Sequence, residues 1–216
     1  MTDPLNLPGT EPLDIGAFRL GERRATLVET IRQLDRLRPK IMVETGCQHT
    51  ELAYEHGLST TLFGMLARRY GATLYTVDSD AEHLRRCRKL TLPYANHIEY
   101  VHLDSLQVLR EFSGVIDFLY LDSLDFKPGA MEQSRIHQLS EIVYAWPRLA
   151  ERSLVLLDDA NVQKWFSQSL GPKDREGKTF YAHRYLRSRG ARCLMDIPNY
   201  QRLYRLDRSS SGAPSC

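Results

Sequence analysis

Acidic side chains follow, or stand within, five short apolar runs of the sequence. They are Glu44, Asp78, Asp104, Asp122 and the pair Asp158-Asp159. If these runs are neighbouring strands of an open α/β sheet, the acids face the crevice in which such sheets bind ligands. Any single acid could equally cap the helix that follows it, but five in succession favour a binding site. A row of oxygen acceptors suits a ligand rich in hydroxyl and amino donors, such as a nucleoside.

The connection after the first run adds to this prediction. Gly46 follows Glu44-Thr45, and a glycine there lets the backbone approach a ligand closely. Ser59 or Thr60 begins the next helical segment, where it could cap the helix or meet a carboxylate at the helix N-terminus. The spacing is not G-x-G-x-x-G, and no lysine-containing phosphate loop is present. These absences disfavour a pyrophosphate dinucleotide.

The acids after the fourth and fifth runs point to a second kind of chemistry. Neighbouring strands lie about 4.8 Å apart, so Asp122, Asp158 and Asp159 could converge on one cation. Ligands that are all oxygen favour Mg²⁺, Ca²⁺ or Mn²⁺ over zinc. The alternative is that the Asp pair only caps the following segment.

Strands and helices must alternate to position these acids. Short runs with little polar alternation predict strands buried on both faces, joined by right-handed helical crossovers. The predicted strands are 41–45, 73–78, 98–104, 115–122 and 153–159, and the predicted helices are 59–70, 80–91, 105–112 and 131–146. An amphipathic helix before the first strand ends at Pro39, and another spans 178–189. The runs 192–197 and 201–207 are so close in sequence that they must be antiparallel neighbours.

Length and composition limit the classes of function. The 216 residues, with a net charge of +2, fit one domain over 1–208, with an N-terminal arm and helix (1–38) and a disordered tail (209–216). The small charge excess gives no support for nucleic acid as a partner. No membrane-spanning run or secretory signal is present, so we expect a cytoplasmic protein without a membrane partner. The cysteines are then expected to be free thiols; they are Cys47, Cys87, Cys193 and Cys216.

Six motifs together resemble the class I S-adenosylmethionine-dependent methyltransferases. They are VETG (43–46), GLSTTLF (57–63), LYTVDSD (74–80), HLDSL (102–106), IDFLYLDSLD (116–125) and LVLLDDAN (154–161). The resemblance extends from about Pro39 to Leu206 and is closest to the small, metal-dependent O-methyltransferase type. It implies a Rossmann-like, doubly wound α/β fold with a mostly parallel seven-stranded sheet and an antiparallel last strand.

The resemblance also implies a division of the site between cofactor and metal. Glu44 and Gly46 would line the methionine end of S-adenosylmethionine, and Ser59 would lie near its carboxylate. Asp78 would accept both ribose hydroxyls. Asp104 and Ser105 would border the adenine. The metal, Mg²⁺ or another hard divalent cation, would be held by Asp122, Asp158 and Asp159, with Asp122 also acting in catalysis.

Departures from the family pattern concern the acceptor side. Catechol-type members carry a catalytic lysine where this chain has Asp125, which could be the general base or an ordinary loop acid. His137 could serve as a base or substrate contact, or be satisfied within its helix. Lys178 could meet an anionic substrate, but a surface position is favoured.

The longer loop at 47–56 brings in two histidines, and a later loop brings in two aromatic residues. His49 and His56 could touch substrate or be solvated. Trp165 and Phe166 could roof an acceptor pocket or close the core.

The leading hypothesis is metal-assisted methyl transfer to a hydroxyl of a small-molecule acceptor, with a sugar or natural product as a candidate. Two alternatives stay open at this stage: a non-catalytic nucleoside-binding or scaffold protein, and a different reaction on the same fold. A homo-oligomer assembled through the N-terminal helix is a further expectation.

Overall fold

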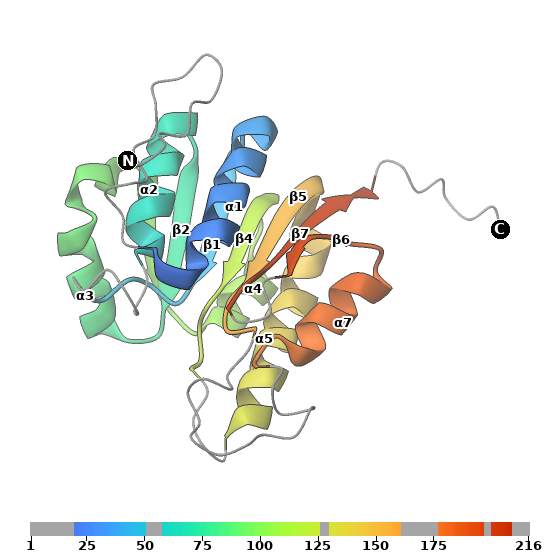
Figure 1. Ribbon diagram of the computed structural model, residues 1–216. Coiled ribbons are helices and arrows are strands. Elements are labelled where there is room, and N and C mark those ends of the chain that lie inside the picture. The colour runs from blue at the N-terminus through green and yellow to red at the C-terminus, as the bar shows by residue number, and fades with distance from the viewer. Residues whose placement is uncertain (1–19, 51–57, 126–129, 161–176, 197–199, 209–216) are drawn as a thin grey trace.

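The computed structural model describes residues 20–50, 58–125, 130–160, 177–196 and 200–208. In these residues a single sheet of seven strands has the order β3-β2-β1-β4-β5-β7-β6 (Figure 1). The strands are β1 (Ile41–Thr45), β2 (Thr73–Asp78), β3 (Ile98–His102), β4 (Ile116–Leu121), β5 (Leu149–Leu157), β6 (Arg192–Asp196) and β7 (Arg202–Asp207). The first five strands pair in parallel, and β7 pairs antiparallel with both β5 and β6. The predicted fold class is confirmed.

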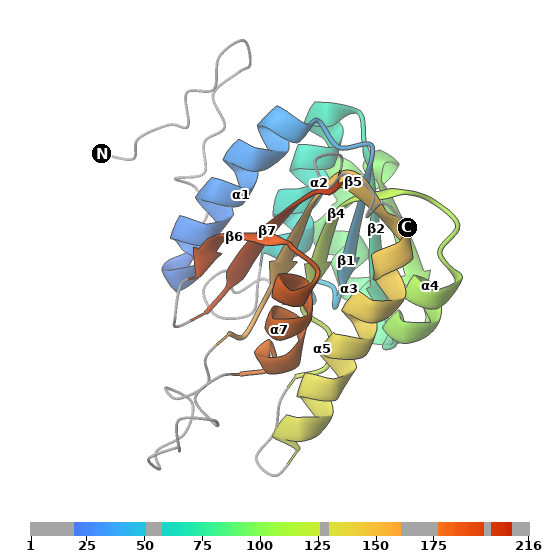
Figure 2. The same cartoon turned by 90° about the vertical axis from the view of Figure 1, so that its right-hand side faces the viewer.

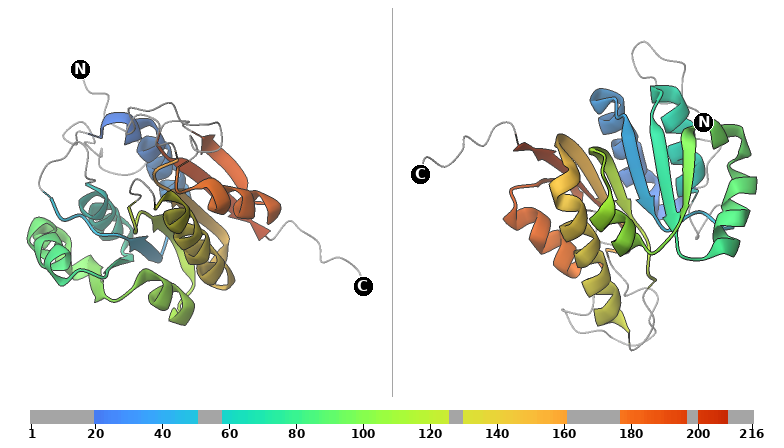
Figure 3. Two further views of the ribbon diagram at one scale, coloured as in Figure 1. Left: turned by 90° about the horizontal axis from the view of Figure 1, so that it is seen from below. Right: turned by 180° about the vertical axis from the view of Figure 1, so that it is seen from behind.

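Helices cover both faces of the sheet, as Figures 2 and 3 show. They are α1 (Arg24–Leu37), α2 (Ser59–Tyr70), α3 (Ala81–Leu90), α4 (Ser105–Glu111), α5 (Met131–Ala145) and α7 (Phe180–Ser188), with short 3-10 turns η2 (Gly21–Arg23), η3 (Leu92–His97) and η4 (Trp146–Arg148). One hydrophobic core joins α1 and α2 to one face of the sheet. A second core joins α4, α5 and α7 to the other face.

The central strands supply both cores because their alternate side chains point to opposite faces. Met42 and Phe118 belong to the core under α1 and α2, whereas Val43, Leu119 and Val155 belong to the core under α5 and α7. This is why the central runs of the sequence show so little polar alternation.

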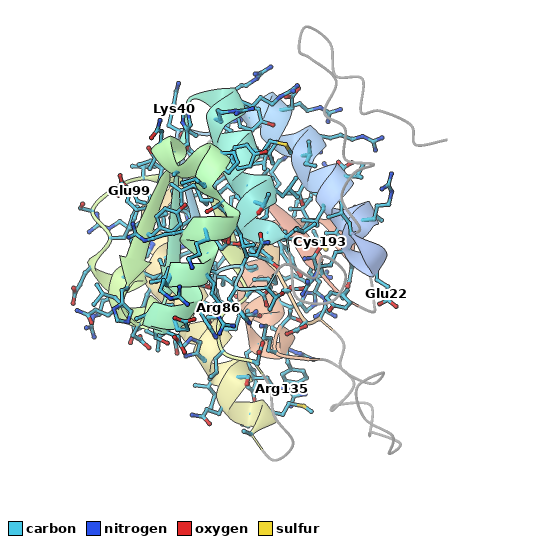
Figure 4. The ribbon with its side chains drawn as sticks, turned by 90° about the vertical axis from the view of Figure 1, so that its left-hand side faces the viewer. Glu22, Lys40, Arg86, Glu99, Arg135 and Cys193 are labelled. Atoms are coloured by element: carbon cyan, nitrogen blue, oxygen red, sulfur yellow. The ribbon has the colours of Figure 1, made fainter. Side chains whose placement is uncertain are left out.

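The outer surface carries charges of both signs. Figure 4 shows Lys40, Arg86, Glu99 and Glu22 spread over one side of the molecule, among many other acidic and basic side chains. None of the helices in the described part of the chain has the length and apolar character needed to cross a membrane.

The register brings the carboxyl ends of the central strands to one level. Thr45 in β1 pairs with Leu121 in β4, and Leu121 pairs with Leu157 in β5. The backbone ladder continues one residue further: Asp122 N donates to Thr45 O at 3.0 Å, and Asp158 N donates to Leu121 O at 3.1 Å. The fold therefore places these two acids side by side, as the sequence predicted.

Several element boundaries differ from the prediction by one to four residues, and two of these differences lie at the site. The fifth strand ends at Leu157 rather than at Asp159, because Asp159 adopts a left-handed backbone conformation with φ of 55° that turns the chain out of the sheet. The last helix begins at Phe180 rather than at Lys178. The N-terminal arm and the C-terminal tail lie outside the described residues.

Candidate active site

A cavity of about 660 Å³ opens at the carboxyl ends of β1, β2 and β4. Nine of the residues predicted from the sequence line it: Gly46, Ser59, Asp78, Asp104, Ser105, Asp122, Asp125, His137 and Asp159. The two other predicted residues, Glu44 and Asp158, are fully buried and do not line the cavity. The cavity lies where an open α/β sheet is expected to bind its ligand.

Gly46 makes the turn out of β1 and requires its glycine. Its φ is +82°, a region that other residues rarely adopt. A Cβ atom at this position would lie 2.3 Å from the carbonyl oxygen of Asp122. The turn therefore packs directly against the end of β4 and leaves the space above it free.

Glu44 is buried below that turn. Its Oε2 atom accepts hydrogen bonds from Thr60 Oγ1 at 2.7 Å and from Thr76 Oγ1 at 2.9 Å. Its Oε1 atom is buried and has no hydrogen-bond partner among the residues that the structure describes. Burial raises the pKa of Glu44 to about 7, although hydrogen bonds from Ser59, Thr60 and Thr76 oppose the rise. The carboxyl group therefore holds one buried oxygen free for a further donor.

A residue that sequence analysis missed organises the start of α2. The Gln48 side chain accepts hydrogen bonds from Thr61 N at 3.2 Å and from Thr61 Oγ1 at 2.6 Å, while Gln48 N donates to Thr60 Oγ1 at 2.8 Å. Ser59, predicted as a cap or a carboxylate contact, is the first residue of α2 and lines the cavity, while Leu58 stands at the N-cap position.

Asp78 is fixed at the end of β2. Its Oδ2 atom accepts from Cys47 N at 3.2 Å, and its Oδ1 atom accepts from Asp80 N at 2.9 Å. His83 Nδ1 lies 3.5 Å from Oδ2, and the His83 ring stacks on that of His49 with centroids 3.9 Å apart. Each carboxylate oxygen can accept more than one hydrogen bond, so Asp78 retains acceptor capacity toward the cavity.

Asp104 both caps a helix and borders the cavity. It is the N-cap of α4, where its Oδ1 atom accepts from Leu106 N at 2.9 Å and from Gln107 N at 3.3 Å. It also lines the cavity beside Ser105. Asp80 is the corresponding N-cap of α3 but does not line the cavity.

His137 belongs to a hydrogen-bonded chain of polar side chains. Its Nε2 atom lies 3.1 Å from Ser105 Oγ and 3.6 Å from Glu141 Oε1. Ser123 Oγ donates to the same Glu141 oxygen at 2.7 Å. Burial alone would lower the pKa of His137, but the contact with Glu141 raises it. Glu141 was missed from the sequence, although its position four residues after His137 on one helix face is a usable signal.

The three acids predicted to hold a metal are paired with two cations of the protein. Arg23 Nη2 lies 2.6 Å from Asp158 Oδ2 and 3.8 Å from Asp122 Oδ2. Lys178 Nζ lies 2.9 Å from Asp122 Oδ1 and 3.1 Å from Asp159 Oδ2. Lys178 is only 1% exposed, so the prediction of a surface position was wrong.

The charges of this cluster depend on one another. Burial would lower the pKa values of Lys178 and Arg23, but the acids around them raise both. Burial would raise the pKa of Asp122, yet Lys178 and Arg23 hold it below its ordinary value. Burial raises the pKa of Asp158 against the pull of Arg23. Tyr120, whose hydroxyl lies 2.7 Å from Asp158 Oδ2 and 3.0 Å from Asp122 Oδ2, keeps its proton because burial and these acids raise its pKa.

The predicted divalent cation does not fit this arrangement. Hard cations require several carboxylate oxygens directed at one point, whereas Arg23 and Lys178 already occupy the space between the acids. Across the described ranges, no group of three or more His, Cys, Asp or Glu side chains is arranged to hold a metal ion. The three acids do lie close together as predicted, but the cations between them are the side chains of Arg23 and Lys178.

Asp125 stands at the rim of the cavity. Its side chain is exposed, yet partial desolvation by the surrounding chain raises its pKa; Lys178 opposes this rise, and Asp122 and Asp159 add to it. Within the described part of the chain its carboxylate makes no hydrogen bond. Three other residues named from the sequence, His56, Trp165 and Phe166, lie outside the described residues.

Comparison with known proteins identifies the family to which the chain belongs. The profile of a family described as a methyltransferase domain matches residues 51–160, about half of the chain. No curated protein matches the sequence.

Solved structures resemble the fold at low sequence identity. A proposed O-methyltransferase from Klebsiella pneumoniae is 16% identical, with a TM-score of 0.58 over 85% of this chain and 80% of that one. A methyltransferase from Podospora anserina with bound S-adenosylhomocysteine is 13% identical, with a TM-score of 0.56 over 85% and 78%. An O-methyltransferase from Bacillus cereus in complex with S-adenosylhomocysteine is 15% identical, with a TM-score of 0.52 over 81% and 76%. The chain thus belongs to the methyltransferase domain family and has the fold of the class I S-adenosylmethionine-dependent enzymes.

Proposed function

We propose that the protein transfers a methyl group from S-adenosylmethionine to a hydroxyl oxygen of a small molecule. The observation that carries the proposal is the carboxylate of Asp78, fixed at the end of β2 beside the Gly46 turn and open to the cavity. A carboxylate with spare acceptor capacity in this position suits the two adjacent hydroxyls of a ribose. Two structural neighbours hold S-adenosylhomocysteine.

The residues around Asp78 also fit the rest of this cofactor. Glu44 does not itself line the cavity, but its buried Oε1 atom has no partner among the described residues, and the ammonium of a methionine moiety that enters beside the Gly46 turn is a donor that would satisfy it. Ser105 and Asp104 line the far side of the cavity and would border the adenine. When bound, S-adenosylmethionine supplies a methyl group on a positively charged sulfur.

The protein must then orient the acceptor and remove its hydroxyl proton. Asp125 suits the role of base because its carboxylate is free of hydrogen bonds within the described residues and its raised pKa makes the ionised form a better proton acceptor. It takes the proton as the acceptor oxygen forms its bond to the methyl carbon and the carbon–sulfur bond breaks. His137, held by Ser105 and Glu141, supports the adenine side instead.

The acceptor is proposed as a small hydroxylated molecule because acids and hydroxyls dominate the lining near β4. Asp122, Ser123, Asp125 and Asp159 all border this part of the cavity. Hydrogen-bonding side chains of this kind suit an acceptor with several hydroxyl groups, such as a sugar or a polyhydroxylated natural product, better than an apolar one.

The proposal is tested by following release of S-adenosylhomocysteine during incubation with S-adenosylmethionine and a panel of hydroxylated small molecules, each paired with its deoxy analogue. Turnover should require the hydroxyl. Asp125→Asn should lower kcat by about 10²- to 10⁴-fold without changing affinity for S-adenosylhomocysteine, whereas His137→Asn should weaken that affinity. Turnover that persists in Asp125→Asn contradicts the assigned base. Cofactor binding without transfer to any member of the panel favours a non-catalytic role.

A further inference from the structure

The acid cluster at the ends of β4 and β5 contains two protein cations, the partly buried Arg23 and the buried Lys178. Arg23 comes from η2, just before α1, and contacts Asp158, 135 residues away. Lys178 comes from the turn before α7 and contacts Asp122, 56 residues away. Both are held firmly: the guanidinium of Arg23 stacks over the ring of Tyr200, 4.5 Å from its centroid, and Lys178 is 1% exposed.

The carboxylate oxygens of Asp122 and Asp158 already have partners. Asp122 Oδ1 accepts from Lys178, and its Oδ2 lies 3.0 Å from the hydroxyl of Tyr120. Asp158 Oδ2 accepts from Arg23 and from the closer Tyr120 hydroxyl, and its Oδ1 accepts the backbone N–H of the next residue. A divalent cation would have to displace the ammonium of Lys178 from these acids, and an unpaired ammonium at a position as buried as this one is strongly unfavourable.

Arg23 and Lys178 also match a divalent cation in total charge. An arginine and a lysine together carry two positive charges, the same total as one divalent cation. From these contacts we infer that Arg23 and Lys178 take the place of a divalent metal at the ends of β4 and β5, so that the methyl transfer proposed above proceeds without a metal ion. The ion pairs support the replacement of the metal by the two cations. That methyl transfer needs no metal rests in addition on the proposed function.

The two cations would have different roles. Lys178 lies behind the acids and does not line the cavity, so it neutralises Asp122 and Asp159. Arg23 does line the cavity, and within the described ranges its buried Nε atom has no hydrogen-bond partner. Arg23 is therefore the cation that an acceptor oxygen meets, where its fixed charge stabilises the negative charge that develops on that oxygen. A fixed guanidinium does not bind and acidify a hydroxyl as a metal does, which is why a side-chain base is needed.

Titration with Mn²⁺, followed by the electron paramagnetic resonance signal of the free ion, tests the inference directly. The wild-type protein, both alone and in the presence of S-adenosylhomocysteine, should bind no Mn²⁺ more tightly than about 1 mM. Lys178→Gln frees two carboxylates and should gain Mn²⁺ binding at least about tenfold tighter. If that variant does not fold, Arg23→Gln serves the same purpose. Arg69→Gln, which removes a cation that pairs with Asp35 far from the cavity, should gain none.

Stoichiometric micromolar Mn²⁺ binding by the wild type, lost in Asp159→Asn, would overturn the inference. Loss of turnover when a chelator is added would also overturn it. Because Mn²⁺ is measured directly, failure of the protein to bind S-adenosylhomocysteine would contradict the proposed function and not the account of the ion pairs.

Discussion

The two halves of the cavity are built in different ways. On the β2 side, acids accept hydrogen bonds from backbone N–H groups, as Asp78 does from Cys47 and Asp80 and Asp104 does from Leu106. On the β4–β5 side, acids pair with charged side chains that are far away in the sequence. The same residue type at the same edge of the sheet thus gives carboxylates held by backbone N–H groups in one half and an ion-pair network in the other. A motif of strand-end acids alone does not decide between them.

The largest effect should come from removing a cation on the β4–β5 side. Lys178→Met removes the buried cation that Asp122 and Asp159 share, and breaking a buried ion pair by removing one partner costs about 3–5 kcal/mol. Urea unfolding followed by circular dichroism measures the change. Asp78→Ala, on the opposite side, should change the free energy of unfolding far less. Equal losses in the free energy of unfolding for Lys178→Met and Asp78→Ala would contradict the view that only the β4–β5 side depends on buried ion pairs.

A second prediction concerns the pH dependence of stability through Glu44. Its pKa in the folded protein is about 7, above the ordinary 4.5. Its contribution to stability is therefore fully present below pH 4.5 and is lost as the pH rises through 7, because the folded state disfavours the charged form. At about 1.36 kcal/mol per pKa unit, the loss is about 3 kcal/mol. Glu44→Gln should remove this part of the pH dependence when unfolding is compared at pH 5 and pH 8. An unchanged pH dependence would mean that Glu44 is charged in the folded state.

Affinity for the cofactor provides a third test. Asp78→Ala removes an ionised acceptor for ribose hydroxyls, and hydrogen bonds to charged groups contribute about 1.5–3 kcal/mol. Calorimetric titration should show S-adenosylhomocysteine binding weakened by roughly 10- to 100-fold. Arg69→Gln, distant from the cavity, serves as the control and should bind normally. Undiminished binding by Asp78→Ala would contradict the ribose role.

The sequence predicted those features whose partners lie nearby. The strand-end positions of Asp78 and Asp104, the Gly46 turn and the convergence of Asp122 with Asp158 all follow from the alternation of strands and helices. These are consequences of local hydrogen bonds and of parallel strand register, which short stretches of sequence encode.

The partners of the acids could not be predicted in the same way. Arg23 and Lys178 reach the cluster only because α1 and α7 pack beside β5 and β7, and nothing in their own segments marks them as buried. Gln48 caps α2 from a loop that the family pattern lacks. Glu141 was also missed, but it could have been predicted, because its spacing of four residues from His137 is visible in the sequence.

The smallest predicted effect concerns Asp104 and Asp80, which are both helix N-caps but differ in whether they line the cavity. Asp104→Ala removes the N-cap of α4 and should cost about 1 kcal/mol of stability, with a several-fold loss of affinity for S-adenosylhomocysteine because Asp104 lines the cavity. Asp80→Ala removes the corresponding cap of α3 outside the cavity. The affinity of the Asp80→Ala variant for S-adenosylhomocysteine should not change. If both variants bind equally well, Asp104 acts only as a cap.

The most direct test of the whole account is calorimetric titration of S-adenosylhomocysteine into the wild-type protein, first with Mg²⁺ and then with excess chelator. The account predicts roughly micromolar binding that is the same in both conditions, because Asp78 and Glu44 hold the nucleoside and the methionine moiety while Arg23 and Lys178 satisfy the acids. Absence of binding in both conditions would contradict the assignment of the cavity as the cofactor site. Binding that appears only with Mg²⁺ would contradict the metal-free cluster.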